Sequence, residues 1–258
     1  MSKGDKGIRL YGYLLAVLAI FSPLLPACAF GDEVDDILKI KENNHNRVKR
    51  MSSEYTIETR QPKSLKDPKT VKMRYRMKLE KLPPQERKKG SNNPWRLQAE
   101  VIEPMAMNMK VEGDQAWFLD QHKQWVELQL TAEMREQFAG MSERAMGPDP
   151  VKMKQNFSIK VLRHNNPIFG PRTRTVEYIP KGQAKLFARM EEDMNDDGLP
   201  LETRIFDDKG KNTVKITVKK HRKIKGIPVV DEMDAESDTP AGIITSTTRN
   251  ENVEVETE

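Results

Sequence analysis

The chain has 258 residues, enough for one domain or two small ones with a sizeable hydrophobic core. Hydrophobic residues make up 36% and charged residues 32%, which is polar for a globular protein but excludes a disordered chain. The formal net charge is +5 and falls to about +3 without residues 1–29, an excess of cations too small for a nucleic-acid-binding surface.

The first 29 residues have the composition of an export signal. Lys3, Lys6 and Arg9 form a basic start, and an apolar run over 10–25 follows. Ala27–Ala29 then supplies the small residues that a signal peptidase requires. A retained membrane anchor is the alternative, but two prolines argue against it, and no later apolar run approaches the roughly 20 residues of a membrane span. We therefore expect residues 1–29 to be a cleaved signal peptide, and residues 30–258 to be one domain in the periplasm.

Cys28 is the only cysteine, so the mature domain has no disulfide. Its surroundings imitate a lipobox, in which Cys28 would be lipidated and become the new N-terminus. Pro26 is a poor residue for that motif, and the misfit favours cleavage after Ala29 or Gly31, which discards the cysteine. Lipidation, which would place the protein on a membrane, stays open as the alternative.

Asp32–Met51 is predicted to be a helix, since it begins with acidic residues that are favourable at a helix N-terminus. One stripe of this helix is expected to face a core. His45 lies on the stripe, and we interpret it as a packing residue because no ligand partner is near. The stripe consists of Val34, Ile37, Leu38, Lys41, His45 and Val48.

From Ser52 onward the apolar period changes to two, which predicts strands with one apolar and one wet face. The clearest strand is 71–79, where Val71, Met73, Tyr75, Met77 and Leu79 alternate with Lys72, Arg74, Arg76 and Lys78. We expect the apolar set on a concave face, because a one-residue slip would bury four cations. Similar runs predict strands at 54–59, 95–101, 107–111, 116–119, 125–130, 157–162, 173–179, 185–194, 201–207, 213–222, 243–248 and 252–255.

Thr131 opens a second predicted helix with an apolar stripe, and Gly147 followed by Pro148 ends it. We expect Met134, Phe138 and Met141 to form the underside of a lid over the apolar face of the sheet. The alternative is a fixed plug whose stripe is core. The variant Phe138→Glu separates the two, since a plug would lose stability while a lid would lose only the binding of apolar ligands.

Many short strands in meander order, with few helices, exclude a parallel α/β fold, which needs a helix between most strands. The consistent choice is a mainly β, α+β architecture in which one large antiparallel sheet curls around a core.

Two segments imitate functional motifs. The run Asp193–Gly198 matches the opening of a calcium-binding loop, but Pro200 and Arg204 stand at its eighth and twelfth positions, so we interpret it as a hairpin turn. The run Lys219–Lys225 is interpreted as a solvated strand end, with weak contact to anionic lipid headgroups as the alternative.

No catalytic constellation is found. The four histidines, His45, His122, His164 and His221, are far apart in the sequence and have no partner at ligand spacing. A nucleophile elbow, a P-loop and a dinucleotide fingerprint are all missing from the sequence. We therefore expect no catalytic residues, no metal site and no cofactor, and nucleic acid is not an expected partner of an exported protein.

Several segments, in their order and spacing, resemble the LolA-like outer-membrane lipoprotein-sorting family over nearly all of the mature chain. They are Val34–Leu38, Ser53–Ile57, Val111–Phe118, Trp125–Leu128, Tyr178–Pro180, Gly198–Leu201, Asp207–Lys211 and Ile224–Pro228. The resemblance implies an open antiparallel half-barrel, closed by an N-terminal helix and an inserted helical lid, with an apolar cavity for acyl chains. The carriers of that family move lipidated proteins across the periplasm without ATP or a cofactor.

The chain is longer than those carriers, and the arginine that ties down their lid has no counterpart that can be placed, so no single residue is carried over from the family. The leading hypothesis is a periplasmic carrier of lipid or lipoprotein acyl chains, not an enzyme. The alternative is an envelope sensor on the same scaffold that binds a lipoprotein or a membrane partner protein. A third class, an envelope hydrolase, lacks a catalytic motif.

Thirteen of the 14 methionines follow the signal, and many lie on apolar faces. Methionine is flexible and polarizable, which suits a surface that must fit varied apolar shapes, although ordinary core filling explains it equally well. The residues expected to line the cavity are Val71, Met73, Tyr75, Met77, Leu79, Leu97, Met107, Met109, Trp117, Val126, Leu128, Met134, Phe138 and Met141.

Overall fold

The structure is a computed structural model, and it describes residues 33–62, 64, 68–86, 95–103, 107–112, 115–129, 131, 150–165, 172–182, 187–195 and 198–258. The signal peptide, Cys28 and the lid residues Met134, Phe138 and Met141 were all predicted in segments that lie outside these residues.

Two short α-helices, one 3-10 helix and thirteen strands make up the described residues. They are α2 (Glu33–Arg47), β1 (Val48–Arg60), β2 (Thr70–Lys81), η1 (Pro84–Glu86), β3 (Trp95–Glu103), β4 (Met107–Glu112), β5 (Gln115–Leu119), β6 (Trp125–Glu127), α4 (Pro150–Asn156), β7 (Phe157–Asn165), β8 (Thr173–Pro180), β9 (Arg189–Asn195), β10 (Pro200–Phe206), β11 (Asn212–Ile224), β12 (Ile227–Thr239) and β13 (Gly242–Thr257).

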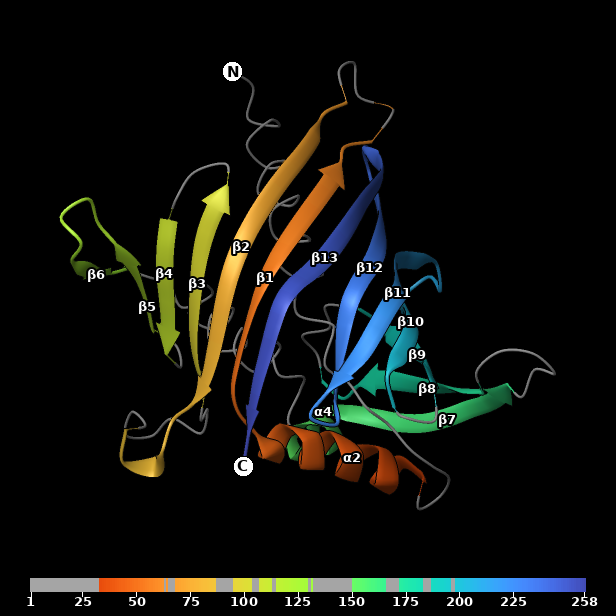
Figure 1. Cartoon of the computed structure of the whole chain (residues 1–258). Coiled ribbons are helices and arrows are strands. Elements are labelled where there is room, and N and C mark those ends of the chain that lie inside the picture. The colour runs from red at the N-terminus through yellow and green to blue at the C-terminus, as the bar shows by residue number, and fades with distance from the viewer. Residues whose placement is uncertain are drawn as a thin grey trace.

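All thirteen strands belong to one antiparallel sheet with the order β6-β5-β4-β3-β2-β1-β13-β12-β11-β10-β9-β8-β7 (Figure 1). The chain starts in the middle of the sheet, runs outward to β6, and resumes at the opposite edge with β7. It then returns inward until β13 pairs with β1. The sheet is therefore two meanders joined at the β1–β13 pair.

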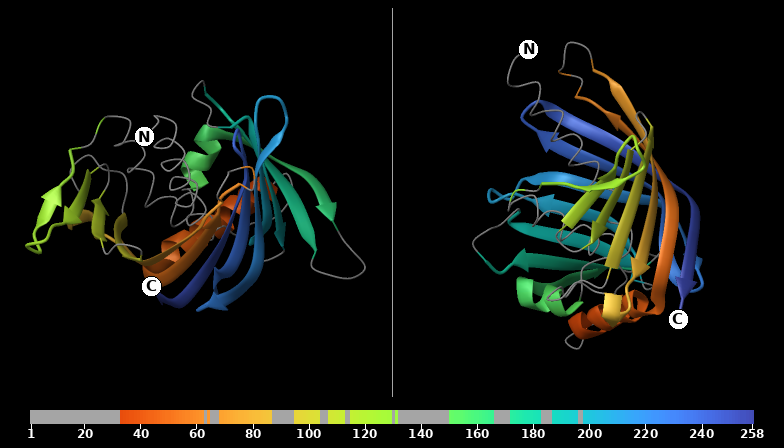
Figure 2. Two further views of the ribbon diagram at one scale, coloured as in Figure 1. Left: turned by 90° about the horizontal axis from the view of Figure 1, so that it is seen from above. Right: turned by 90° about the vertical axis from the view of Figure 1, so that its left-hand side faces the viewer.

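The sheet curls but does not close, and β6 and β7 are its two edges. Seen from above it forms an open trough, with α4 on its concave side, while α2 lies across one end (Figures 1 and 2). This confirms the predicted mainly β architecture with an open half-barrel. The described part of the chain contains no helix with the length and apolarity needed to cross a membrane.

The predicted first helix extends too far. In the structure α2 ends at Arg47 and β1 begins at Val48, four residues before the position at which the apolar period was predicted to change to two. The carbonyl of Arg47 accepts a hydrogen bond from the backbone N–H of Glu258 at 2.9 Å, so pairing with the last strand takes over where the helix stops. Ile37 and Leu38 of the predicted stripe are buried, and so is Val48, but as a strand residue.

The strand prediction missed β12 entirely and divided β13 in two. Strand β12 is rich in Asp and Glu, which are poor strand formers, so its sequence does not indicate a strand. In the structure Asp231, Glu232 and Asp234 face cations of β11 across the strand pair. Such opposite charges on neighbouring strands stabilise the pairing, and this tertiary effect cannot be seen within one segment. Helix α4 was also not predicted.

Candidate functional site

The two faces of the sheet differ in chemistry along its whole width. One uninterrupted row of paired residues defines the inner face, and it consists of Val71, Thr59, Ser246, Ala235, Ile216, Thr203, Glu192, Val176 and Val161. Because side chains alternate between the two faces along a strand, all remaining inner residues can be identified from this row. The inner face is the concave one on which α2 and α4 pack.

The face assignment predicted for β2 is confirmed. Met73, Met77 and Leu79 are buried on the inner face, and Val71 and Tyr75 are partly buried beside them. Lys72 and Arg76 are exposed on the outer face. Arg76 lies 2.6 Å from a carboxylate oxygen of Glu54, and Arg74 lies 3.5 Å from the same side chain. The cations of β2 therefore stay out of the core.

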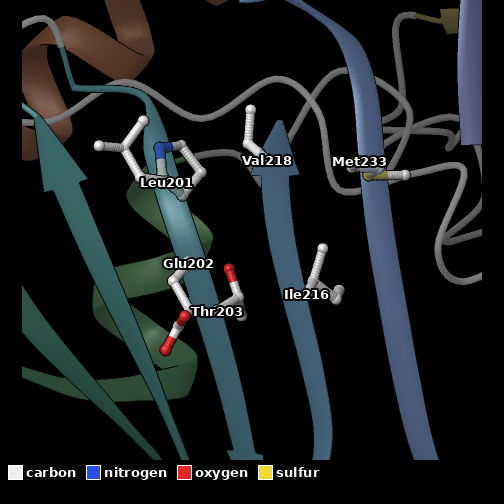
Figure 3. A pocket seen from close by; sticks show the side chains of 7 residues that line it. Leu201, Glu202, Thr203, Ile216, Val218 and Met233 are labelled. Atoms are coloured by element: carbon white, nitrogen blue, oxygen red, sulfur yellow. The ribbon is translucent and has the colours of Figure 1, made fainter. Parts of the chain in front are cut away.

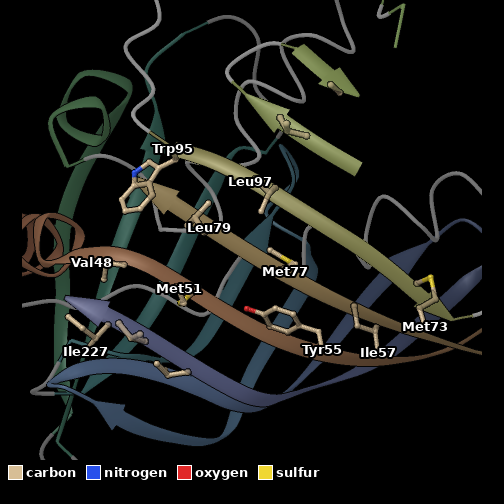
Figure 4. Packing of buried hydrophobic residues seen from close by; sticks show 14 residues of the cluster. Val48, Met51, Tyr55, Ile57, Met73, Met77, Leu79, Trp95, Leu97 and Ile227 are labelled. Atoms are coloured by element: carbon tan, nitrogen blue, oxygen red, sulfur yellow. The ribbon is translucent and has the colours of Figure 1, made fainter. Parts of the chain in front are cut away.

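The first half of the inner face is one apolar cluster built by strands β1 to β5, with contributions from β12 and β13 (Figure 4). Trp95, Leu97 and Ile57 are at most 1% exposed. The predicted lining residues Leu97, Met109 and Leu128 belong to it, whereas the side chain of Met107 lies outside the described set. The sequence reasoning missed Met51, Tyr55, Ile57, Trp95 and Val111, which the same alternation places on this face.

Trp117 is on the wrong face for the predicted lining. Ala116 pairs with Val111 and Phe118 pairs with Met109, and both of these β4 residues are on the inner face. Trp117, which lies between Ala116 and Phe118, therefore points outward. The ammonium nitrogen of Lys110 lies 4.4 Å from the centre of the Trp117 ring, a cation–π contact on the outer surface. Phe118 therefore replaces Trp117 as the inner residue of β5. Val126, which pairs with Phe118, is on the predicted face but is 40% exposed at the sheet edge.

The second half of the inner face is covered by the two helices. Ile37 and Leu38 of α2 and Met153 of α4 form a buried cluster with Val176, Tyr178 and Met194 of the sheet. Phe157 packs edge-on against Tyr178, with their ring centres 6.4 Å apart. This half is therefore already filled by the protein's own side chains.

A small cavity lies between the two halves, on β10, β11 and β12. Its apolar wall is formed by Leu201, Ile216, Val218 and Met233, with Pro200, Glu202 and Thr203 completing it (Figure 3). The volume is about 10 Å³, room for about one water molecule. An acyl chain can lie here only if the side chains around it move.

The buried carboxylates of the described residues, Glu33, Glu177 and Glu192, all lie on or against strands β7 to β9. Glu192 is 1% exposed and is hydrogen-bonded to the hydroxyl of Tyr178. Burial, together with the neighbouring carboxylate of Glu192, raises the pKa of Tyr178 well above its usual value.

A second buried carboxylate, Glu33, is the first residue of α2, and its Oε1 lies 3.5 Å from Nε2 of His164. Burial raises the pKa of Glu33, while Arg174 acts in the opposite direction. Burial also lowers the pKa of His164, and Arg174 adds to this effect.

The two motif-like segments have structural roles. In the calcium-like run, the Asp193 carboxylate lies 2.9 Å from the Arg204 guanidinium, and the Asn195 side chain accepts a hydrogen bond from the N–H of Leu199. Gly198 has a positive φ of 79°, as the predicted hairpin turn requires. In the basic run, Lys219, Lys220 and Arg222 each pair with a β12 carboxylate, so much of its charge is neutralised locally.

The described residues bring no three metal-ligating side chains together. His122 and His221 are exposed, and the side chain of His45 lies outside the described set. The arrangement as a whole is an apolar concave face with isolated buried polar groups.

The fold is similar to several solved structures of bacterial proteins. A DUF1329 family protein from Desulfovibrio piger has a TM-score of 0.59 at 14% identity, and the match covers 85% of this chain and 91% of that one. A LolA superfamily protein from Nitrosomonas europaea has a TM-score of 0.53 at 13% identity, covering 84% and 92% of the two chains. An outer membrane lipoprotein-sorting protein domain from Vibrio parahaemolyticus has the same score and identity, covering 85% and 92%.

The chain therefore has a LolA-like fold, as its sequence segments suggested. At these identities the likeness shows the fold alone. Comparisons with protein-family models and with curated protein sequences give no match.

Proposed function

We propose that this protein is a periplasmic carrier that binds acyl chains of lipids or lipoproteins on the concave face of its sheet. The observation that carries the proposal is the inner face of an open sheet, on which large apolar clusters are separated by a few buried polar residues, in a chain with a LolA-like fold. Each buried methylene of an acyl chain contributes about 0.8 kcal/mol, so apolar area alone supplies affinity, and neither a cofactor nor a nucleotide is needed.

The first half of the face suits a flexible ligand better than the second half. Met51, Met73, Met77 and Met109 line it, and their unbranched side chains change rotamer at low cost. The buried cluster of this half is apolar apart from the hydroxyl of Tyr55 and the indole N–H of Trp95, so a chain displaces mainly apolar contacts. The lid residues Met134, Phe138 and Met141 keep their proposed role as the opposing surface.

The proposal also includes export of the protein from the cytoplasm. Residues 1–29 act as the cleaved signal, and the mature protein begins near Phe30 or Asp32 without a lipid on Cys28. Mass analysis of the mature N-terminus in the native cell envelope tests this, and a diacylated Cys28 would instead place the carrier on a membrane.

Lipid extraction followed by mass spectrometry of the purified protein tests the function itself. Co-purified acyl chains, together with saturable binding of a fluorescent fatty-acyl probe, are the expected result. A stoichiometric protein partner without lipid and without probe binding would support the sensor alternative and exclude the carrier.

A further inference from the structure

The inner face carries a buried polar residue where the two meanders meet. Asn250 of β13 lies directly opposite Tyr55 of β1, and Thr248 follows on the same face two residues away. Asn250 is 9% exposed, Tyr55 is 3% and Thr248 is 3%. These residues lie in the middle of the sheet, between the apolar cluster of β1 to β5 and the small cavity of β10 to β12.

The two ends of the Asn250 amide have different surroundings. Its Nδ2 donates a hydrogen bond to the backbone carbonyl of Val230 at 3.1 Å, which fixes the orientation of the amide. Its Oδ1 is buried, and among the described residues no protein donor lies within hydrogen-bond distance of it. A buried acceptor without a donor is costly, and native proteins contain few of them. The fold uses the Nδ2 of this amide, whereas its Oδ1 is left for a donor from a ligand.

The small cavity of β10 to β12 lies beside this acceptor on the same face of the sheet. Met233 lines the cavity and pairs with Thr248, so Met233 and Asn250 are diagonal neighbours on one face, separated by roughly 7–8 Å. Ile216, Val218 and Leu201 continue the apolar surface away from Asn250 (Figure 3). A chain that lies along these residues and displaces them brings its polar end to Asn250.

The chemistry of the acceptor selects the ligand. An ester linkage has only acceptor atoms, so it cannot satisfy Oδ1. A secondary amide offers one N–H donor, and its carbonyl needs one donor in return. Tyr55, which lies directly opposite Asn250, brings a hydroxyl group to the same part of the face. Because burial raises the pKa of Tyr55, its phenol stays protonated and remains a donor.

We propose that Asn250 is a polar anchor for N-acyl ligands, whose amide N–H donates a hydrogen bond to Oδ1 while the acyl chain lies in the trough of β10 to β12. The inference rests on the proposed acyl-binding function and narrows it to amide-linked chains. Amide and ester of the same chain are bound alike by apolar contacts, so the anchor is what distinguishes them.

Competition against a fluorescent acyl probe tests the anchor with two ligands that differ only in the linkage, N-methyl lauramide and methyl laurate. The wild-type protein is expected to bind the amide about tenfold more tightly, the ratio that one buried hydrogen bond supplies. Asn250→Leu is expected to bind both ligands with the affinity of the ester. Thr248→Val, a change on the same strand and face, is the matched control and retains the preference.

The outcomes separate the two proposals. If neither ligand displaces the probe and the probe itself does not bind, the carrier function and the anchor are both rejected. If both ligands bind equally well to the wild-type protein, or if the preference survives in Asn250→Leu, the carrier function stands and the anchor is rejected. Should Asn250→Leu fail to fold, the wild-type ratio of the two ligands still decides the question.

Discussion

The two halves of the inner face are built by one sheet but filled in different ways. On β7 to β9 the helices α2 and α4 cover the strands, and buried carboxylates such as Glu192 lie among the apolar residues. On β1 to β5 the apolar cluster has no helical member within the described part of the chain, and three of its buried residues are the methionines Met51, Met73 and Met77. The first half of the inner face is therefore suited to adapt to a ligand, whereas the second half is a fixed, tightly packed core.

The difference shows that strand alternation determines which residues face inward but not what covers them. Both halves obey the same period of two. Among the described residues only the second half receives helices: α4 directly precedes β7, and α2, although it directly precedes β1, packs with α4 against the strands of the second half. If this division is correct, substitutions in the second half should change stability, and those in the first half should change binding.

The largest effect is expected for Ile37→Ala, which removes a fully buried side chain between α2 and the second half of the sheet. The truncation leaves a cavity, so the free energy of unfolding should fall by about 2–5 kcal/mol. Binding of a fatty-acyl probe to the remaining folded protein should be unchanged. Chemical denaturation and probe titration on the same sample measure both quantities.

Lys39→Ala is the matched control on the same helix, because the Lys39 side chain is 68% exposed and its ammonium nitrogen lies 3.5 Å from the exposed carboxylate of Asp36. It should leave stability almost unchanged. A loss of probe binding in Ile37→Ala at temperatures where the protein is folded would contradict the division into two halves.

A smaller effect is expected on the outer face, where an arginine stands between carboxylates in each half. Arg204 of the second half lies 2.9 Å from Asp193 and 2.6 Å from Glu202, and its side chain is only 17% exposed. Arg204→Ala removes this cation from Asp193, while Lys215 stays 2.8 Å from Glu202, and should cost about 1–2 kcal/mol after allowing for partial access of water.

Arg76 in the first half lies 2.6 Å from Glu54 and 2.7 Å from Glu100, but its side chain is 55% exposed. Arg76→Ala should cost less than Arg204→Ala, and its effect should vanish in high salt because exposed pairs are screened. Unfolding midpoints of both variants at low and high ionic strength provide the measurement. Equal, salt-sensitive losses would show that the second half is no more tightly built than the first.

A third comparison replaces methionine by leucine in each half. Met73→Leu combined with Met77→Leu keeps the volume but removes flexibility from the proposed ligand surface, so stability should change by less than about 1.5 kcal/mol. Binding of long-chain acyl probes should weaken severalfold. The control pair, Met190→Leu with Met194→Leu, lies under the helices of the second half and should leave binding unchanged. Unaltered binding in both pairs would argue that methionine is only core filling.

The sequence was sufficient for the two faces of β2 but not for the ends of the elements or for every strand. Val71 to Leu79 alternate so regularly that only one register keeps the cations in water, and the structure has that register. Strand β12 was missed because its carboxylates are favourable only when the cations of β11 lie opposite them. Trp117 was misplaced because Trp117 and Phe118 are both aromatic, and only the pairing with β4 shows which one faces inward.

The polar groups of the candidate site were beyond sequence reasoning for a similar reason. Asn250, Glu192 and Glu33 are ordinary surface residues by composition, and nothing near them in the sequence indicates burial. They are buried because strands and a helix distant in sequence pack around them. A period-two count places Asn250 on the face of Thr248, but the acceptor without a donor appears only in three dimensions.

The smallest effect is expected from pH, and it should be confined to the second half. Burial raises the pKa of Glu33 above its ordinary value of 4.5, so folding favours the protonated carboxyl. The stabilising contribution is complete below 4.5 and is lost as the pH rises through the higher pKa of the folded protein. His164 has the opposite sign: burial lowers its pKa below 6.5, so its contribution is present above 6.5 and is lost as the pH falls.

Glu33→Gln removes only the first effect, so the variant should match the wild-type protein below pH 4.5 and become the more stable of the two as the pH rises. Unfolding free energies of the two proteins across this range give the difference directly, with the contribution of His164 common to both. Parallel curves would mean that the Glu33 carboxylate remains solvated and that α2 is not packed as tightly on the second half as the structure indicates.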